Sequence, residues 1–140
     1  MTILKLTFAT LALGACLAAT PTLAETVALK ATLNAASQVP VNDSKGTGTA
    51  AVTFDTASKK LSWKVTSAGL TGPATAGHFH GPAEPGKNAG VAVPFAKVDT
   101  SPIEGSATLT DVQAADLLAG KYYVNIHTKA HPAGEIRGQV

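Results

Sequence analysis

The sequence predicts an all-β fold, an antiparallel Greek-key β-sandwich or barrel with one short helix. Three observations support this prediction. Apolar and polar residues alternate with a period of two in one segment after another, as in half-buried strands. Clusters of Gly, Pro, Asp and Ser separate these segments and favour turns. Only residues 110–120 carry both a start signal and a stop signal for a helix.

The first expected strands are clear from this alternation. Every second residue is apolar in 26–33, which predicts a strand with one buried face. Strands 48–54 and 60–66 are joined by a connection of hairpin length. Trp63, in the second of these strands, is expected in the core. Residues 69–77 are rich in turn formers and are expected to be a turn region.

The second half of the chain is expected to add shorter strands and the helix. Thr110 can cap a helix, with Asp111 in the first turn and Gln113 placed as in a capping box. Gly120 is expected to end that helix. Pro94 cannot donate a ladder hydrogen bond, so its strand is expected at a sheet edge. The expected strands here are 91–98, 105–109, 122–127 and 135–140.

The first 24 residues resemble an export signal, which would leave 25–140 as a single β domain. Lys5 is followed by an apolar run, and Ala24 ends a plausible cleavage site of small residues. This interpretation places the mature protein in the periplasm or outside the cell. Cys16 follows Leu-Gly-Ala, as in a bacterial lipoprotein box, so lipidation at Cys16 and a membrane tether are the alternative. Without Cys16, the mature domain has no thiol for a disulfide or a thiolate ligand.

The charge balance gives no support to nucleic-acid binding. The chain has 11 Lys and Arg residues against 9 Asp and Glu residues, and only 5% of its residues are aromatic. It contains no basic run, so neither a nucleic acid nor an anionic membrane surface is expected as a partner. Oligomeric state is not indicated by the sequence.

The histidines are the main functional signal, because all four fall in two short segments. His78 and His80 are separated by one residue, so an extended backbone places both on one face, roughly 6–7 Å apart at the backbone. Phe79 would then point to the core. His127 is expected at the end of a strand and His131 in the following loop. If these segments are neighbours in space, their imidazoles form one metal site.

The type of ligand narrows the choice of metal. Imidazole without thiolate suits copper, zinc or nickel, and Cu(II) has the highest affinity among the divalent ions. Copper is therefore the first choice and zinc the second. Met1 is the only methionine, so a blue-copper site with Cys and Met ligands is excluded. Four imidazoles would fit tetragonal Cu(II), and three with an open position would fit a catalytic ion.

Other polar residues near these segments allow two interpretations. Alternation places Glu135, Arg137 and Gln139 on one face of the last strand. Either Glu135 and Arg137 pair on a solvated face, or Arg137, the only arginine, lies near the metal and attracts a small anion. Asn125 and Thr128 flank His127 and are candidates for orienting it.

Several of these segments resemble the CHRD domain, a family named after the repeats of the secreted signalling antagonist chordin and widespread in exported bacterial proteins. The resemblance extends from about Val27 to Val140 and implies an extracytoplasmic β-sandwich, without implying an activity. Its motifs are Gln38-Val39-Pro40 with Gly46-Thr47-Gly48, Ala76-Gly77-His78-Phe79-His80-Gly81-Pro82, Gly120-Lys121-Tyr122-Tyr123-Val124-Asn125-Ile126-His127-Thr128 and Gly134-Glu135-Ile136-Arg137-Gly138-Gln139.

The site also resembles that of copper superoxide dismutases, whose β-barrel carries a His-x-His strand pair, further copper histidines and an arginine that guides the anion. This likeness implies that His78, His80, His127 and His131 bind copper and that Arg137 draws in superoxide. The chain lacks the disulfide cysteines and an evident zinc loop of that family.

Three functions are therefore compared. The first is a copper site that is redox active on superoxide. The second is a copper carrier without turnover. The third is a binding or structural module that presents loop 81–90 to a protein or cell-wall partner and uses its histidines only for hydrogen bonds.

Overall fold

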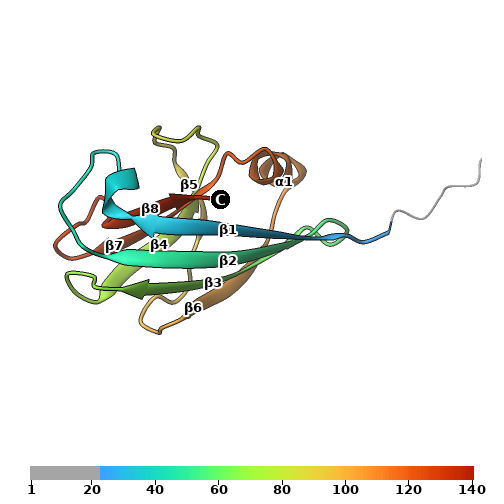
Figure 1. Cartoon of the computed structure of the whole chain (residues 1–140). Coiled ribbons are helices and arrows are strands. Elements are labelled where there is room, and N and C mark those ends of the chain that lie inside the picture. Colours follow the sequence, from blue (N-terminus) through green and yellow to red (C-terminus); the bar gives the residue numbers. More distant parts are fainter. Residues whose placement is uncertain (1–22) are drawn as a thin grey trace, which may run out of the picture.

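The structure, a computed structural model, describes residues 23–140 (Figure 1). The predicted export signal falls almost entirely on residues 1–22, and Cys16 is among them, so both interpretations of that segment lie outside the described residues. The first described residue is Leu23, and the first strand starts at Thr26.

The described chain forms one antiparallel sheet of eight strands in the order β5-β4-β7-β8-β1-β2-β3-β6. A 3-10 turn, η1, and one α-helix, α1, complete the fold. The bounds are β1 Thr26–Asn34, η1 Ala35–Ser37, β2 Thr47–Asp55, β3 Lys60–Ala68, β4 Ala74–His80, β5 Val91–Pro94, β6 Ile103–Thr108, α1 Asp111–Leu118, β7 Tyr123–Thr128 and β8 Ile136–Gln139.

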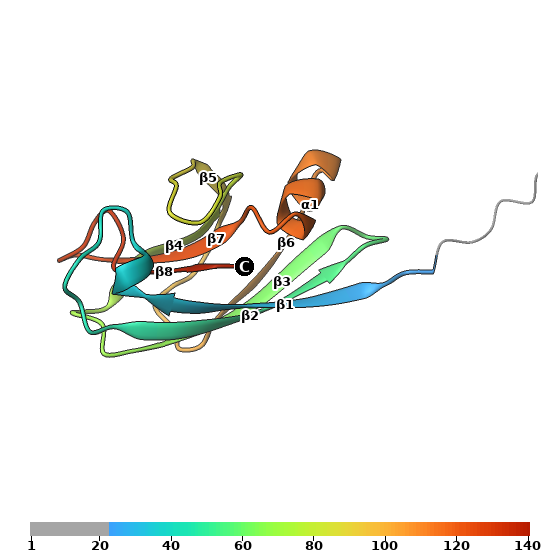
Figure 2. The same ribbon diagram turned by 45° about the horizontal axis from the view of Figure 1, so that its top comes forward.

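The sheet folds over on itself into two facing layers (Figures 1 and 2). Strands β1, β2, β3 and β6 form one layer, and β5, β4, β7 and β8 form the other. The layers are joined where β8 meets β1, and the register there is the single pair Asn34 with Arg137. The predicted antiparallel sandwich or barrel with one short helix is confirmed.

An aromatic cluster fills the space between the layers. Trp63 of β3 lies 4.9 Å from the ring of Phe95 and 5.4 Å from that of Phe79, between ring centroids. Phe79 is completely buried, as alternation in β4 predicted. Two glycines make room for these rings: a Cβ on Gly77 would lie 2.6 Å from Phe95, and one on Gly105 would lie 2.4 Å from Trp63. Trp63 is therefore a core residue, as predicted.

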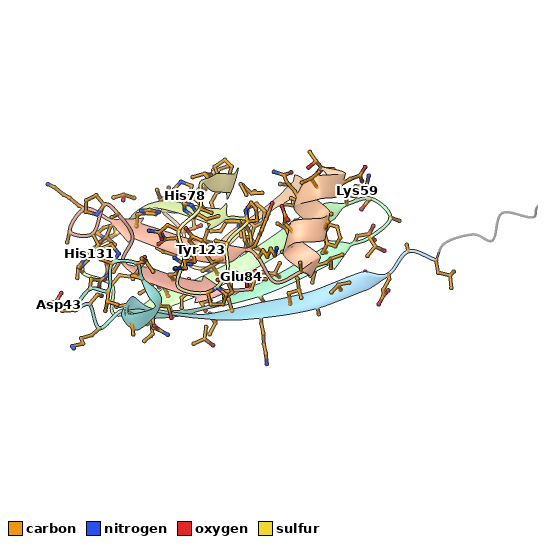
Figure 3. All side chains as sticks on the ribbon, turned by 90° about the horizontal axis from the view of Figure 1, so that it is seen from above. Asp43, Lys59, His78, Glu84, Tyr123 and His131 are labelled. Atoms are coloured by element: carbon orange, nitrogen blue, oxygen red, sulfur yellow. The ribbon has the colours of Figure 1, made fainter. Side chains whose placement is uncertain are left out.

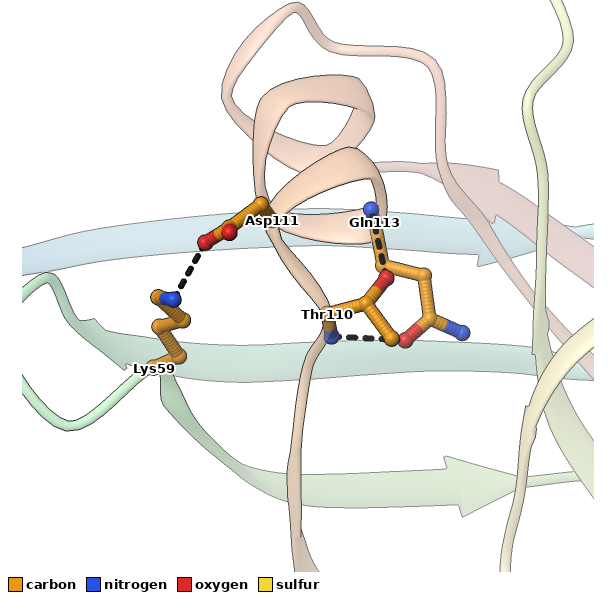
Figure 4. Close-up of polar contacts among 4 residues, drawn as sticks. All are labelled: Lys59, Thr110, Asp111 and Gln113. Atoms are coloured by element: carbon orange, nitrogen blue, oxygen red, sulfur yellow. Dashed lines mark hydrogen bonds and ion pairs between the residues drawn. The ribbon is translucent and has the colours of Figure 1, made fainter.

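Helix α1 has the predicted cap (Figure 4). The hydroxyl of Thr110 accepts a hydrogen bond from the Gln113 N–H, and the Gln113 side chain accepts one from the Thr110 N–H. Asp111 forms an ion pair with Lys59 in the turn between β2 and β3. Gly120, at φ +73°, follows the end of the helix. None of the helices in residues 23–140 is long and apolar enough to cross a membrane.

The main difference from the prediction concerns β4. The turn formers of 69–77 suggested that the first histidines directly follow a turn, whereas β4 already begins at Ala74. Its pairing with β7 starts at Ala74 opposite Thr128. This pairing joins segments that are distant in sequence, so local turn signals do not reveal it. Strand β5 lies at the sheet edge, as Pro94 predicted, but it ends at Pro94 and does not continue to Val98.

Candidate metal centre

The two histidine segments lie side by side because β4 pairs with β7. His80 is opposite Tyr123, His78 is opposite Asn125, and His127 is opposite Ala76. Directly opposite residues of an antiparallel pair point to the same side of the sheet. The three histidines therefore share the outer face of this layer, while Phe79 points into the core. The neighbourhood that the sequence argument required is confirmed.

The three imidazoles of His78, His80 and His127 converge. One ring nitrogen from each lies within 4.8 Å of the other two, and all three side chains are partly buried. The closest pair is Nδ1 of His78 and Nε2 of His127, 3.2 Å apart. The ring centroid of His78 lies 5.2 Å from that of His80 and 5.0 Å from that of His127. We call these three residues the histidine cluster. Figure 3 shows His78 and Tyr123 on this side of the molecule.

Two backbone carbonyls fix which nitrogen each ring offers. Nδ1 of His80 lies 3.0 Å from the carbonyl oxygen of Ala89, and Nδ1 of His127 lies 2.9 Å from that of Pro132. A carbonyl oxygen can only accept a hydrogen bond, so each of these Nδ1 atoms carries the proton. In the neutral ring, Nε2 then keeps its lone pair. Nε2 of His80 is left unpaired among the described residues, whereas Nε2 of His127 accepts a hydrogen bond from Nδ1–H of His78 at 3.2 Å. Each lone pair could serve a metal ion, that of His127 once this hydrogen bond is given up.

His80 Nε2 is a buried polar atom without a hydrogen-bond partner among the described residues. Such atoms are rare in folded proteins, and a bound ion is one of the explanations for them. Within the histidine cluster, the lone pair of His127 Nε2 accepts a hydrogen bond from His78, and that of His80 Nε2 has no partner among the described residues. This unsatisfied atom is the most specific sign that the cluster binds a ligand.

The spacing of the nitrogens fits a transition-metal ion. Imidazole nitrogens bind zinc at about 2.0–2.1 Å, so two of them at an angle of roughly 100° lie about 3.2 Å apart. His78 Nδ1 and His127 Nε2 have this separation of 3.2 Å. The other separations in the cluster are at most 4.8 Å. The donor set fits copper or zinc with at least one coordination position open.

The surroundings favour the neutral form of His78 and of His80. Burial lowers the pKa of His78, and the neighbouring His127 and His80 lower it further. Burial also lowers the pKa of His80; its hydrogen bond to Ala89 opposes this effect, while His127 and Arg137 add to it. His78 and His80 are therefore neutral at pH 7, the state in which imidazole binds a metal.

His131 is not part of the histidine cluster. Its main chain forms a turn, with its N–H donating to the carbonyl of Thr128 at 3.1 Å. Its side chain lines a different surface hollow, together with Val41 and Asn42. Figure 3 shows His131 toward the end of the molecule that carries Asp43, apart from His78. As a fourth ligand, His131 stays a prediction that requires the turn 129–134 to move.

Arg137 lies beneath loop 81–90 and is only 2% exposed. Its Nη1 donates to Oδ1 of Asn88 at 3.0 Å, and its Nη2 donates to the carbonyl of Lys87 at 2.6 Å. Glu135 is also fully buried, and it bonds to Ser44, Thr71 and Thr128. The interpretation of Glu135 and Arg137 as a pair on a solvated face is therefore wrong. Guidance of an anion by Arg137 stays a prediction.

The candidates for orienting His127 have other partners. Asn125 accepts a hydrogen bond from Nε2 of Gln38 at 2.7 Å, and the Thr128 hydroxyl donates to Glu135 at 2.5 Å. The carbonyl of Pro132 orients His127 in their place. Sequence patterns point to side chains that can form hydrogen bonds. They do not indicate which backbone carbonyl a turn will bring to a histidine.

Tyr123 is the site residue that the sequence argument did not select. Its ring is stacked on that of His80, with 4.9 Å between centroids and 3° between planes. The residue is 2% exposed, so it also belongs to the buried packing of this face. Alternation in β7 offered a signal, because Tyr123, Asn125 and His127 occupy every second position and therefore share one face.

The fold and the histidine cluster together define an antiparallel β-sandwich domain with a candidate metal centre on the outer face of one layer. Comparison with known families gives its class: the CHRD domain model matches residues 29–140. The chain therefore belongs to the CHRD domain family. No curated protein and no solved structure gives a significant match to the chain.

Proposed function

We propose that this CHRD domain is exported and binds one copper ion through Nδ1 of His78, Nε2 of His80 and Nε2 of His127. Two observations carry the proposal: one ring nitrogen from each of the three histidines lies within 4.8 Å of the other two, and Nε2 of His80 is buried and unpaired among the described residues. Two carbonyls hold the protons of His80 and His127 on Nδ1, which leaves Nε2 of His80 unpaired and Nε2 of His127 as the acceptor of a hydrogen bond from His78, a bond that a bound ion would replace.

Copper is preferred over zinc for two reasons. An all-imidazole donor set suits both ions, and Cu(II) binds such sites more tightly than Zn(II). An exported domain also meets metals outside the buffering of the cytosol. Zinc remains the second choice, and the same three ligands with a water molecule would complete its tetrahedral shell.

Metal content in matched variants tests the proposal. The purified protein, loaded with copper and passed through a chelating column, should retain one copper ion per chain and show a Cu(II) signal with nitrogen couplings in electron paramagnetic resonance. The double variant His78→Ala/His80→Ala should lose both. His131→Ala, outside the histidine cluster, is the control and should retain the ion. Unchanged copper content in the double variant would refute the site.

Catalytic turnover of superoxide is tested separately, on the same copper-loaded protein. Superoxide dismutation requires the ion to alternate between Cu(II) and Cu(I), taking an electron from one superoxide and passing it with two protons to another. The engagement of both terminal nitrogens of Arg137 by Lys87 and Asn88 favours a second candidate function, copper carriage without turnover. A superoxide assay on copper-loaded protein decides: activity above that of free copper supports the enzyme, and its absence supports the carrier.

The proposed export is tested at the N-terminus. Mass spectrometry of the protein from its native host should show a chain that begins at Glu25, in the periplasm or the medium. A lipid-modified N-terminus at Cys16 would instead place the domain on a membrane. An intact Met1 with the protein in the cytosol would contradict export.

A further inference from the structure

The ring of Tyr123 lies between His80 and Arg137. On one face it is stacked on the His80 imidazole, with 3° between planes. Arg137 also lies over this ring, with its Cζ 3.4 Å from the ring centre. Because β7 lies between β4 and β8 in the sheet, Arg137 of β8 approaches the ring from the side opposite His80 of β4. A guanidinium over an aromatic face is held by cation–π attraction, and this attraction strengthens when both groups are desolvated. Arg137 and Tyr123 are each 2% exposed. Arg137 therefore fixes the Tyr123 ring on which the His80 imidazole is stacked.

The guanidinium also fixes the end of loop 81–90. It donates to the carbonyl of Lys87 and to the side chain of Asn88. Asn88 in turn donates from Nδ2 to the carbonyl of Val39 at 2.9 Å. Arginine suits this position because its planar head can stack and hydrogen-bond at the same time. The residue next to Asn88 is Ala89, whose carbonyl orients His80.

The carbonyl of Ala89 is the point where these contacts meet. It accepts hydrogen bonds from Nδ1 of His80 at 3.0 Å and from the Tyr123 hydroxyl at 3.3 Å. The Ala89 N–H donates to the same hydroxyl at 3.2 Å. The position of this carbonyl decides whether the proton of His80 stays on Nδ1 and leaves Nε2 free for an ion.

From these contacts we infer that Arg137 is a positioning residue for the candidate metal centre: by fixing Tyr123 and residues 87–89, it holds His80 in the tautomer and ring plane that expose Nε2 to the histidine cluster. Arg137 acts here through the tyrosine ring and the loop and does not contact the ion. This inference rests on the proposed function for its effect on metal affinity. Its effect on the tautomer of His80 is independent of any metal.

Two variants test the inference. Arg137→Met removes the charge and both hydrogen bonds while filling much of the space. Tyr123→Phe removes only the hydroxyl that contacts Ala89 and keeps the aromatic stack. Copper affinity should fall by roughly 10- to 100-fold in Arg137→Met, the usual effect of losing a partner that orients a ligand. Tyr123→Phe should show a smaller loss, and it decides the matter if Arg137→Met does not fold.

Gln139→Leu is the matched control. Gln139 lies on the same strand as Arg137, two residues further on, and donates from Nε2 to the carbonyls of Ala83 and Gly120 at 3.0 and 2.8 Å. It therefore holds the beginning of loop 81–90, whereas Arg137 holds its end. A loss of general stability would appear in both strand variants, but only Arg137→Met should change copper affinity.

The tautomer of His80 is the second readout, and it is measured without metal. NMR of the labelled imidazole nitrogens should show Nδ1–H in the unchanged protein and in Gln139→Leu, and a shift toward Nε2–H in Arg137→Met. If the unchanged protein bound no copper, the proposed function would fail, and this measurement would still judge the positioning role. Wild-type tautomer and affinity in folded Arg137→Met and in Tyr123→Phe would overturn the inference. Azide, a small anion, serves as a probe of anion binding at copper. If copper-loaded Arg137→Met lost azide binding but kept the copper affinity and the His80 tautomer of the unchanged protein, the inference would also be overturned, because Arg137 would then act on anions.

Discussion

Hydrogen bonds from outside the histidine cluster decide what each ring can do. Ala89 and Pro132 each supply a carbonyl to an Nδ1 atom, so His80 and His127 present Nε2 to the cluster. His78 presents Nδ1 toward His127 at 3.2 Å. Burial of His78 and His80 lowers their pKa and keeps them neutral. Groups outside the cluster thus set the tautomers of His80 and His127.

Glu135 is a second buried residue whose partners determine its behaviour. Burial opposes its charge, but hydrogen bonds from Ser44, Thr128 and Thr71 outweigh this and lower its pKa to about 2. The lowered pKa means that ionisation of Glu135 stabilises the fold at neutral pH. We expect Glu135→Gln to lower the free energy of unfolding by about 1–3 kcal/mol at pH 7, because it removes the charge that strengthens these hydrogen bonds.

The sign of the pH dependence follows from that lowered pKa. The contribution is fully present above the ordinary carboxyl pKa of about 4.5 and is lost as the pH falls from there toward about 2. Urea unfolding of both proteins should therefore show a difference that is constant from pH 7 to pH 5 and narrows in acid. A difference that stays the same down to pH 2 would contradict the ionised, hydrogen-bonded state.

Gly134 illustrates a requirement for glycine at one backbone position. Its φ is +121°, and a Cβ there would lie 2.4 Å from Oδ1 of Asn125 and 2.8 Å from Nε2 of Gln38, two atoms that share a buried hydrogen bond. We expect Gly134→Ala to cost about 2 kcal/mol or more in thermal or urea unfolding. Gly72→Ala is the control, since nothing lies within 4 Å of its Cβ position, and it should change stability by less than about 1 kcal/mol.

The regular elements were the most predictable part of this chain. Alternation located β1, β2 and β3 to within two residues at either end, because each buries one face against the core. The capping box located α1, because Thr110 and Gln113 satisfy each other's backbone N–H groups locally. The start of β4 at Ala74 was missed, because it depends on pairing with β7, about fifty residues further along the chain.

The cap of α1 supplies a prediction at the scale of one element. Thr110→Ala removes the hydroxyl that accepts from the Gln113 N–H, so we expect a loss of about 1 kcal/mol in the free energy of unfolding. Asp111→Asn is the comparison, because it leaves the capping box intact and removes an exposed charge, with its ion pair to Lys59 and its interaction with the helix dipole; the aspartate side chain is 83% exposed. It should cost less than about 1 kcal/mol. A stability of Thr110→Ala equal to that of the unchanged protein would contradict a stabilising role for the cap hydrogen bond.

The candidate site depends on the arrangement of the whole molecule. The outer face of β4, β7 and β8 carries His78, Asn125 and Arg137 in register, and loop 81–90 with residues 38–42 covers part of it. The sequence correctly indicated that both histidine segments meet, since each could be assigned to an extended segment. It did not indicate which loop covers that face, and so it left Arg137 free to be interpreted as a solvated or anion-guiding residue.

Metal binding should also be visible in the stability of the domain. An ion that binds only the folded state at a hundred times its dissociation constant adds about 2.7 kcal/mol. For a domain of this size we expect a rise in melting temperature of roughly 10 °C on adding copper, reversed by a chelator. His78→Ala/His80→Ala should show no rise. A melting temperature indifferent to copper and zinc would instead support a module whose histidines only form hydrogen bonds.

The position of the ion is the most direct test of the claim that three imidazoles share one cation. Crystals of the copper-loaded protein, measured at the copper absorption edge, should show one anomalous peak about 2 Å from Nδ1 of His78, Nε2 of His80 and Nε2 of His127. Arg137 should remain on the far face of Tyr123 in that crystal. A peak at His131 without the three cluster histidines, or no ordered peak at full copper loading, would contradict the account.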